Sequence, residues 1–482
     1  MPSDFCGVRA WNGIPICDSS DYSLRCGHSS VTIARRIAIA VSAATIGLGL
    51  LTAPAARATP GSGDDWYPVD YDVNAEDGPA WRATMAANGR GVVFSGENYR
   101  DYDATSDTWG NWTRLHTDPE RLSAQGNARG DVCTAWSADF GAAIACRKSG
   151  ARTFAKKNIS TSRNATVEGL AVSRDGRRAL IIWRDTTNNG SRVYATVYTL
   201  ATGRILTTRL RGIPGGTPLG YYPAAARVGR ANGFVLANRT GAEDPWGSAT
   251  YYRTFAPRSG WSAQTALRLG TPARDVVISD ISSDGRRTYV SVTPDIPQAS
   301  ADAPSVWWIG ELRNGTFTTP GVVNETLYWP VIGSSGANVH IAGSDPANRE
   351  LVIAGFDDFN SRTLSTFRFY SPQVADTVGR VSDVSIVGQR FSDGNDGFSA
   401  VVQYTGISNP GDESEEDVDQ LFSVRGSLAN ATCIERLGAK SGYEGMGTKL
   451  AGYGQYALAV YSSGMQLYAA AKTGEILMEP SP

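Results

Sequence analysis

Residues 171–183 read AVSRDGRRALIIW, and residues 280–292 read DISSDGRRTYVSV. In each stretch a short apolar run leads into Asp-Gly-Arg-Arg, and a second run of apolar or β-branched residues follows. Asp-Gly supplies the positive φ that a tight turn requires, and β-branched residues favour strands. Both stretches therefore predict a β-hairpin, and their likeness indicates one unit of an internal repeat.

Six weaker copies share this order of strand, turn and strand. They lie at 85–94, 137–146, 227–237, 344–354, 391–402 and 452–461. Successive turns are about 52 residues apart on average, and further strand-like runs follow most of them. Each unit is therefore expected to hold about four short strands, and no long stretch shows helical periodicity.

Repeats of this length with four strands each predict an all-β protein, a β-propeller, because a four-stranded blade buries both faces only between neighbours in a ring. Eight blades would use almost all of residues 59–482, and seven would need longer units. The spacing favours eight four-stranded blades and leaves seven open. Two stacked β-sandwiches are the alternative architecture.

A family resemblance rests on the two strongest turns. Residues 173–178, SRDGRR, and 282–287, SSDGRR, resemble the S-P-D-G-K/R turn of TolB-like, WD-repeat-like bacterial propellers. Arg174 and Ser283 stand where that family has Pro, and no Trp-Asp dipeptide ends a unit. The resemblance implies the propeller fold and leaves function open, because propellers host many functions.

The N-terminal region predicts export. Residues 31–58 carry an Arg pair, an apolar run and the small-residue end Ala56-Arg57-Ala58, the plan of a secretory signal peptide. We expect a secreted, extracellular protein whose mature chain, 59–482, is one propeller domain. Residues 1–30 precede this signal and are interpreted as a mis-called start or a disordered leader. Arginine outnumbers lysine 39 to six, a bias that indicates a GC-rich bacterial genome.

Three cysteines remain after the signal peptide, and export permits a disulfide between two of them. Cys133 and Cys146 fall in two short strand-like runs around a turn. Near-opposed positions of a hairpin meet disulfide geometry, so we predict a Cys133–Cys146 bond. Cys433 is left over, and its state stays open.

The sequence excludes several kinds of chemistry. A formal charge of −2 shows no nucleic-acid footprint, and no run after the signal is long enough for a membrane span. Only His116 and His340 follow the signal, which argues against a His-rich metal site, and HExxH, P-loop, GxSxG and GxGxxG motifs are absent. We therefore expect no metal and no cofactor. Catalytic and ligand-binding residues are not identifiable.

Three weaker patterns have plainer interpretations. Residues 105–112, TSDTWGNW, have the residue types of a sialidase Asp box with one residue too many. Residues 393–397, DGNDG, suggest a Ca²⁺ loop but fit a hairpin turn better, and the acidic run 412–417 fits a solvated loop better than a cation site. Aromatic pairs such as Tyr221-Tyr222 and Trp307-Trp308 could stack on sugars, although packing between blades is preferred.

These patterns favour a monomeric binding module that takes an extracellular glycan or a protein partner at a channel mouth, where loops of several blades converge. A sialidase-like or other glycoside hydrolase is the first alternative. A structural or adhesive envelope protein is the second. Whether the chain is an enzyme is uncertain, and the residues weigh against it.

Overall fold

The computed structural model describes residues 9–11, 14–16, 66–72 and most of 81–472. The gaps within 81–472 are 107, 118, 188–189, 211–216, 242–248, 270–273, 294–304, 314–315, 319–320, 346–349, 362, 370–379, 391–395, 409–415, 427–431, 442–447, 454–455 and 464–465. Secondary structure in the described part is all strand and turn. It holds no helix that is long and apolar enough to cross a membrane.

The chain divides into two compact units. The first, Met1–Asp65 with Ile476–Pro482, contains the antiparallel pair β1 (Arg9–Trp11) and β2 (Ile14–Ile16). The second, Trp66–Glu475, contains all other strands. The predicted signal peptide, 31–58, lies outside the described residues, as does most of the predicted leader, 1–30.

The first half of the second unit forms four antiparallel sheets that follow one another in chain order. One contains β4 (Trp81–Met85), β5 (Arg90–Ser95), β6 (Asn98–Asp103), β7 (Thr108–Trp109) and β8 (Thr113–Arg114). The next contains β9 (Arg121–Gly126), β10 (Val132–Ala138), β11 (Gly141–Arg147) and β12 (Ala155–Ser160). The third contains β13 (Ala165–Val172), β14 (Arg178–Thr187), β15 (Gly190–Thr199) and β16 (Arg204–Arg209). The fourth contains β17 (Thr217–Val228), β18 (Ala231–Gly241), β19 (Ala249–Ala256), β20 (Gly260–Trp261) and β21 (Thr265–Ala266).

The second half is less regular. A short pair, β22 (Arg268–Leu269) with β23 (Arg274–Asp275), precedes one eight-stranded sheet. That sheet contains β24 (Val277–Ser283), β25 (Thr288–Thr293), β26 (Ser305–Arg313), β27 (Thr316–Phe317), β28 (Gly321–Ser335), β29 (Asn338–Asp345), β30 (Glu350–Phe356) and β31 (Ser365–Phe369). Two four-stranded sheets follow: β32 (Arg380–Arg390), β33 (Asp396–Ser408), β34 (Glu416–Gly426) and β35 (Thr432–Ser441), then β36 (Thr448–Tyr453), β37 (Tyr456–Ser463), β38 (Gln466–Lys472) and β3 (Trp66–Asp72).

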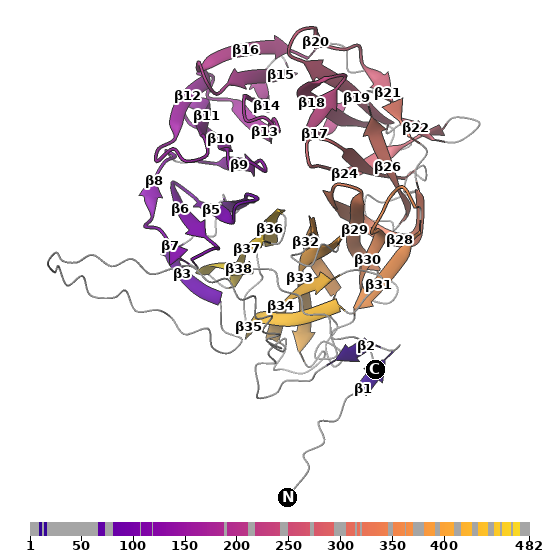
Figure 1. The fold of residues 1–482 in the computed structure, drawn as a ribbon. Coiled ribbons are helices and arrows are strands. Elements are labelled where there is room, and N and C mark those ends of the chain that lie inside the picture. Colours follow the sequence, from indigo (N-terminus) through magenta and orange to yellow (C-terminus); the bar gives the residue numbers. More distant parts are fainter. Residues whose placement is uncertain are drawn as a thin grey trace, which may run out of the picture. The chain divides into compact units, whose positions relative to one another are not determined.

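The sheets of this unit close into a ring (Figure 1). The innermost strands contact one another in the order β4, β9, β13, β17, β24, β28, β32 and β36, and β36 contacts β4 again. The last sheet joins both ends of the unit, because β3 pairs with β38. A ring closed through a shared sheet leaves no open end, which confirms the all-β propeller fold and excludes two stacked sandwiches.

The described sheets differ in number and size from the blades that the sequence predicts. Four sheets have four strands, two carry a short fifth strand and one has eight, so they are not the seven or eight separate four-stranded blades that were expected. The long strand β28 is the reason. Its first half pairs with β26 and its second half with β29, with a register shift between Tyr328 and Val331. Pro330 lies in that shift, where a residue without an N–H is tolerated.

The core lies between the faces of successive sheets. The cluster between the β9–β12 and β13–β16 sheets includes Cys133, Ile144, Ile181 and Trp183, all nearly inaccessible to solvent. Similar clusters lie between several other pairs of neighbours. Because side chains alternate across a strand, each apolar run supplies one set of residues to each neighbouring sheet.

Candidate functional site

One face of the ring is built from the turns that follow the innermost strands. Antiparallel strands reverse direction at each turn, so the turns between first and second strands, and between third and fourth, share a face. We call this the turn face. The Asp-Gly turns predicted from the repeat lie there, and Gly176 and Gly285 have φ of 62° and 78°, which confirms the left-handed conformation expected of them.

Neighbouring turns on this face are joined directly. Asn127 donates a side-chain hydrogen bond to the carbonyl of Ser173, and Arg129 donates one to the carbonyl of Asp175. Asn127 also donates to Asp131, whose carboxylate occupies the place that a Cβ added at Gly176 would take. Glycine is thus required at 176 both by its φ and by the carboxylate of the preceding sheet.

A central cavity of about 310 Å³ runs behind the turn face. Residues of eight strands, β4, β9, β13, β17, β24, β28, β32 and β36, line it, together with their turns. Most of its wall consists of Ala, Gly, Ser and small apolar side chains. Such a wall offers few groups that could take part in acid–base catalysis.

Charged groups lie at both ends of this cavity. On the turn face, the Arg174 side chain lies against Gly285, and Asp284 and Tyr453 also line the cavity. Burial raises the pKa of the Tyr453 hydroxyl, and Asp284 adds to the effect. The mouth on this side is therefore narrowed by side chains from three sheets.

At the other end, Asp280, Asp383, Lys449 and Arg82 occupy inner strands next to the cavity-lining residues. Asp280 accepts hydrogen bonds from the N–H groups of Ile281 and Ile332, yet burial raises its pKa to about 6. Burial also disfavours the charged form of Lys449 and so lowers its pKa, and its ammonium lies 3.9 Å from Asp383. Both aspartates follow a register shift in an inner strand, so the repeat places them at equivalent positions.

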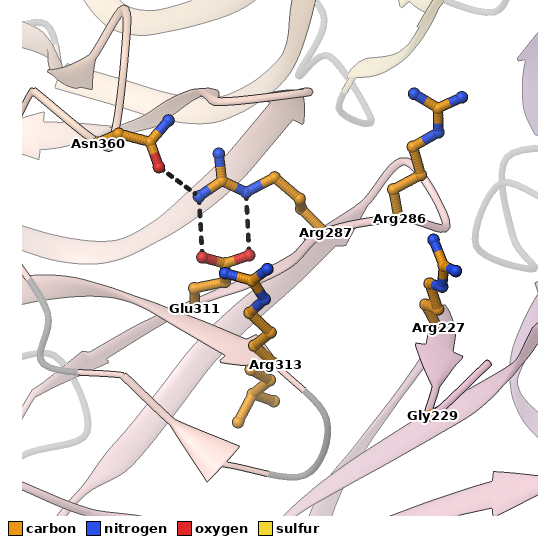
Figure 2. Close-up of a pocket in the computed structure, with 8 residues that line it drawn as sticks. Arg227, Gly229, Arg286, Arg287, Glu311, Arg313 and Asn360 are labelled. Carbon is orange, nitrogen blue, oxygen red and sulfur yellow. Dashed lines mark hydrogen bonds and ion pairs between the residues drawn. The ribbon is translucent and has the colours of Figure 1, made fainter.

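A cleft of about 540 Å³ opens on the turn face and adjoins the cavity through consecutive residues, Gly285 and Arg286. We call it the arginine cleft. Its lining residues are Arg227, Gly229, Arg286, Arg287, Glu311, Leu312, Arg313 and Asn360. Figure 2 shows Arg227 and Arg286 on one side and Arg287, Glu311 and Arg313 on the other.

The four arginines of the cleft differ in their partners. Arg287 donates from Nε and from one terminal nitrogen to the two oxygens of Glu311, at 2.9 and 2.8 Å, and also to Asn360 (Figure 2). Hydrogen bonding to Glu311 raises the pKa of the Arg287 guanidinium. Arg227, Arg286 and Arg313 are exposed and form no ion pair with another described residue. The cleft therefore presents guanidinium groups whose hydrogen-bond donors face solvent.

The histidines singled out in the sequence are structural. His116 is buried between Trp136 and Phe94, and its Nδ1 lies 2.9 Å from the Gly96 carbonyl. A carbonyl only accepts, so Nδ1 carries the proton and Nε2 accepts from the Thr134 hydroxyl. Burial lowers the pKa of His116 to about 4, so the ring is neutral at pH 7. His340 is fully buried on β29, with Nε2 3.1 Å from Asp357.

The structure contains the Cys133–Cys146 disulfide, between directly paired positions of β10 and β11 with Cα atoms 4.1 Å apart. The aromatic pairs supply packing: Tyr221 and Trp307 are buried. Asp107 of the box-like segment and most of 393–397 and 412–417 fall outside the described residues. In the described part, no group of three or more His, Cys, Asp or Glu residues is placed to hold a metal ion.

The arginine cleft was not identified from the sequence. With 39 arginines in the chain, no single one stands out. The available signal was the pair of DGRR turns, in which the first arginine, Arg177 or Arg286, is exposed and the second, Arg178 or Arg287, is partly buried. Arg227 and Arg313 come from other strands and join this turn only in the fold.

Comparison with known proteins adds little. No protein family and no curated relative matches the sequence. Among solved structures, the WD40 domain of SCAP from fission yeast has a TM-score of 0.47 at 9% identity, covering 86% of this chain and 99% of that one. A functionally unknown protein from Desulfotomaculum acetoxidans DSM 771 has a TM-score of 0.40 at 11% identity, covering 74% and 99%.

Proposed function

We propose that this chain is an exported binding module that takes an anionic group of an extracellular glycan or protein partner in the arginine cleft. One observation carries the proposal: three exposed guanidinium groups, of Arg227, Arg286 and Arg313, surround a cleft in which Arg287 is already held by Glu311. Planar guanidinium groups bind carboxylate, sulfate and phosphate oxygens through paired hydrogen bonds.

The fixed pair between Arg287 and Glu311 supports this role. Glu311 is nearly fully buried, and both of its oxygens accept from Arg287, so its charge is largely neutralised. The remaining arginines therefore set the electrostatic character of the cleft. A bound anion would replace the mutual repulsion of these cations with ion pairs.

Glycoside hydrolysis is less well supported. Such enzymes generally use two carboxyl groups, or a carboxyl group with a tyrosine nucleophile, on either side of the scissile bond. Among described residues, Glu311 supplies the only carboxylate that lines the cleft, and Arg287 holds it. A binding role needs no further catalytic group.

The blade number is part of the same proposal. We propose eight blades, in which the eight-stranded sheet combines two and β28 contributes its first half to one and its second half to the next. The eight inner strands that line the cavity and the switch of partner along β28 support this count.

The test is titration of the purified chain with inorganic sulfate and with galacturonate, followed by calorimetry and by thermal unfolding. We expect saturable binding and stabilisation that Arg227→Gln/Arg313→Gln weakens about tenfold, which is what two exposed ion pairs contribute. The matched control is Arg163→Gln/Arg192→Gln, two exposed arginines at the end of the β13–β16 sheet that lies away from the turn face. Equal binding by both variants, or no saturable binding at all, would overturn the proposal.

A further inference from the structure

We infer that the turn face binds a linear acidic polysaccharide, which passes from the arginine cleft along an arc of arginines on successive sheets. This inference rests on the proposed function of the cleft and names the class of ligand. It concerns residues outside the cleft, on the turns of the sheets that precede it in the chain.

The arc repeats one structural position. Exposed arginines at or next to the turn after the innermost strand include Arg90, Arg129, Arg177, Arg230 and Arg286, one on each of five consecutive sheets. Arg227 and Arg390 are also exposed next to such turns. Arg286 is also part of the arginine cleft, so the arc ends there. Because inner strands of neighbouring sheets contact one another, these turns follow each other around the face (Figure 1).

The carboxylates on the same turns are held by backbone groups. Asp175 accepts from the N–H of Arg177 at 3.2 Å, and Asp284 accepts from the N–H groups of Arg286 and Arg287 at 2.7 and 2.8 Å. Asp131 is buried and accepts from the N–H of Ser149. These acids cap their own turns, whereas the arginine side chains are exposed, although Arg129 also donates to the carbonyl of Asp175. Their ion pairs are long: Arg177–Asp175 and Arg90–Asp103 are both 3.9 Å.

The exposed arginines of the turn face stand out because the chain as a whole is not basic. The formal net charge is −2, so cations gathered on one face are balanced by acids elsewhere. In the sequence, three of the segments that join second to third strands, 242–248, 294–304 and 409–415, contain seven Asp or Glu residues and no Lys or Arg. A face with one sign of charge steers an oppositely charged partner and fixes its orientation.

The described turns of the arc carry no large exposed apolar side chain, which favours a polysaccharide over a nucleic acid. Nucleic-acid surfaces combine cations with aromatic side chains on which bases stack. Among described residues, the exposed large apolar side chains are Phe140 and Leu206, and neither is on a turn of the arc. Neutral glycans also depend on aromatic stacking, so the ligand that fits is one held by its charges. A chain with an acidic group on each sugar meets a regular series of arginines with a regular series of anions.

The experiment measures binding of galacturonate oligomers with one, three, six and nine sugars at low and at physiological salt. We expect affinity to increase at least about tenfold from the monomer to the hexamer, because linked sites bind cooperatively through effective concentration, and to decrease with salt. Arg129→Gln/Arg177→Gln/Arg230→Gln should weaken hexamer binding about tenfold and leave monomer binding unchanged.

The matched control is Arg114→Gln/Arg163→Gln/Arg192→Gln, which removes the same charge from exposed positions off the arc. It should bind the hexamer like the natural chain. Circular dichroism and unfolding midpoints of both variants establish that each is folded.

The outcomes separate the two proposals. Monomer binding in the cleft with no dependence on oligomer length would overturn the polysaccharide inference and retain the proposed function. Loss of all binding, monomer included, would overturn both. Single-stranded oligothymidylate of equal charge is the comparison polymer, and binding as tight as that of the hexamer would overturn the inference in favour of a nucleic acid.

Discussion

Arg287 and Glu311 form a two-point ion pair between β26 and the turn after β24, with N–O distances of 2.9 and 2.8 Å. The pair is largely withdrawn from solvent, with side-chain exposures of 21% and 7%. It stabilises the side of the arginine cleft from which Arg313 projects. The site therefore depends on a pair of lining residues whose charges are already satisfied by each other.

Glu311→Gln should lower the free energy of unfolding by about 1–3 kcal/mol, because it leaves a partly buried guanidinium without its counter-charge. Urea denaturation gives this value. The control is Arg268→Gln, which removes an exposed pair with Asp275 and should change stability by less than about 0.5 kcal/mol. A change of the same size in both variants would show that the Arg287–Glu311 pair does not stabilise the cleft.

Gly176→Ala should lower the free energy of unfolding by more than the positive φ of this residue alone would cause. A Cβ there meets the carboxylate of Asp131, so we expect a loss of about 3–4 kcal/mol, the sum of left-handed strain and a disrupted buried hydrogen-bond group. Gly203 has a similar φ of 66°, and an added Cβ has only the Tyr198 hydroxyl near it, at 3.9 Å. Gly203→Ala should therefore lose only about 1–2 kcal/mol. Equal losses would contradict the close approach of the two turns.

Replacing both cysteines of the disulfide by alanine should lower stability by about 3 kcal/mol, since the bond closes a loop of 13 residues in the unfolded chain. Guanidinium denaturation of the oxidised natural chain, the reduced natural chain and Cys133→Ala/Cys146→Ala measures it. The reduced chain should resemble the double variant. If reduction had no effect, the crosslink would not contribute to stability.

His116 makes stability depend on pH. The unfolded imidazole takes up a proton below its ordinary pKa of 6.5, whereas the buried ring resists protonation down to about 4. The neutral His116 ring contributes fully to the free energy of unfolding above pH 6.5. About 3 kcal/mol of that free energy is lost as pH falls to about 4. Titration of the His116 ring by NMR should give the low pKa directly, and a value near 6.5 would refute this account.

Asp280 acts in the opposite direction. Its pKa is raised from 3.8 to about 6, which favours the protonated carboxyl in the folded chain. Its contribution to the free energy of unfolding is therefore complete below pH 3.8 and is lost as pH rises through 6. The two effects partly cancel between pH 4 and 6 in the natural chain. Asp280→Asn, which retains a neutral side chain, should therefore be more stable relative to the natural chain at pH 8 than at pH 4. Unfolding curves at both values test this, and a difference independent of pH would contradict it.

Sequence periodicity was sufficient to predict the ring of sheets and the Asp-Gly turns. Hairpins are local: the alternation of apolar residues and the positive φ of Gly176 and Gly285 act within about ten residues. The pairing of Cys133 with Cys146 was predictable for the same reason, since both belong to one hairpin. The unequal sizes of the sheets were not predictable, because β28 changes its partner within one continuous strand, at a point marked by Pro330 and by no turn.

The arginine cleft required the tertiary structure. Arg227, Arg286 and Arg313 are far apart in the chain, and each is an ordinary surface residue in its own segment. The same holds for Asp131 and Gly176, which meet only because neighbouring sheets pack face to face.

The sequence by itself determined the all-β repeat, its turns and the hairpin cysteines, because short-range backbone preferences and side-chain alternation decide these. Only the tertiary structure decided which charges meet, since ring closure brings turns from different repeats onto one face. Electrostatic interaction depends on distance in space, and separation along the chain does not reveal that distance.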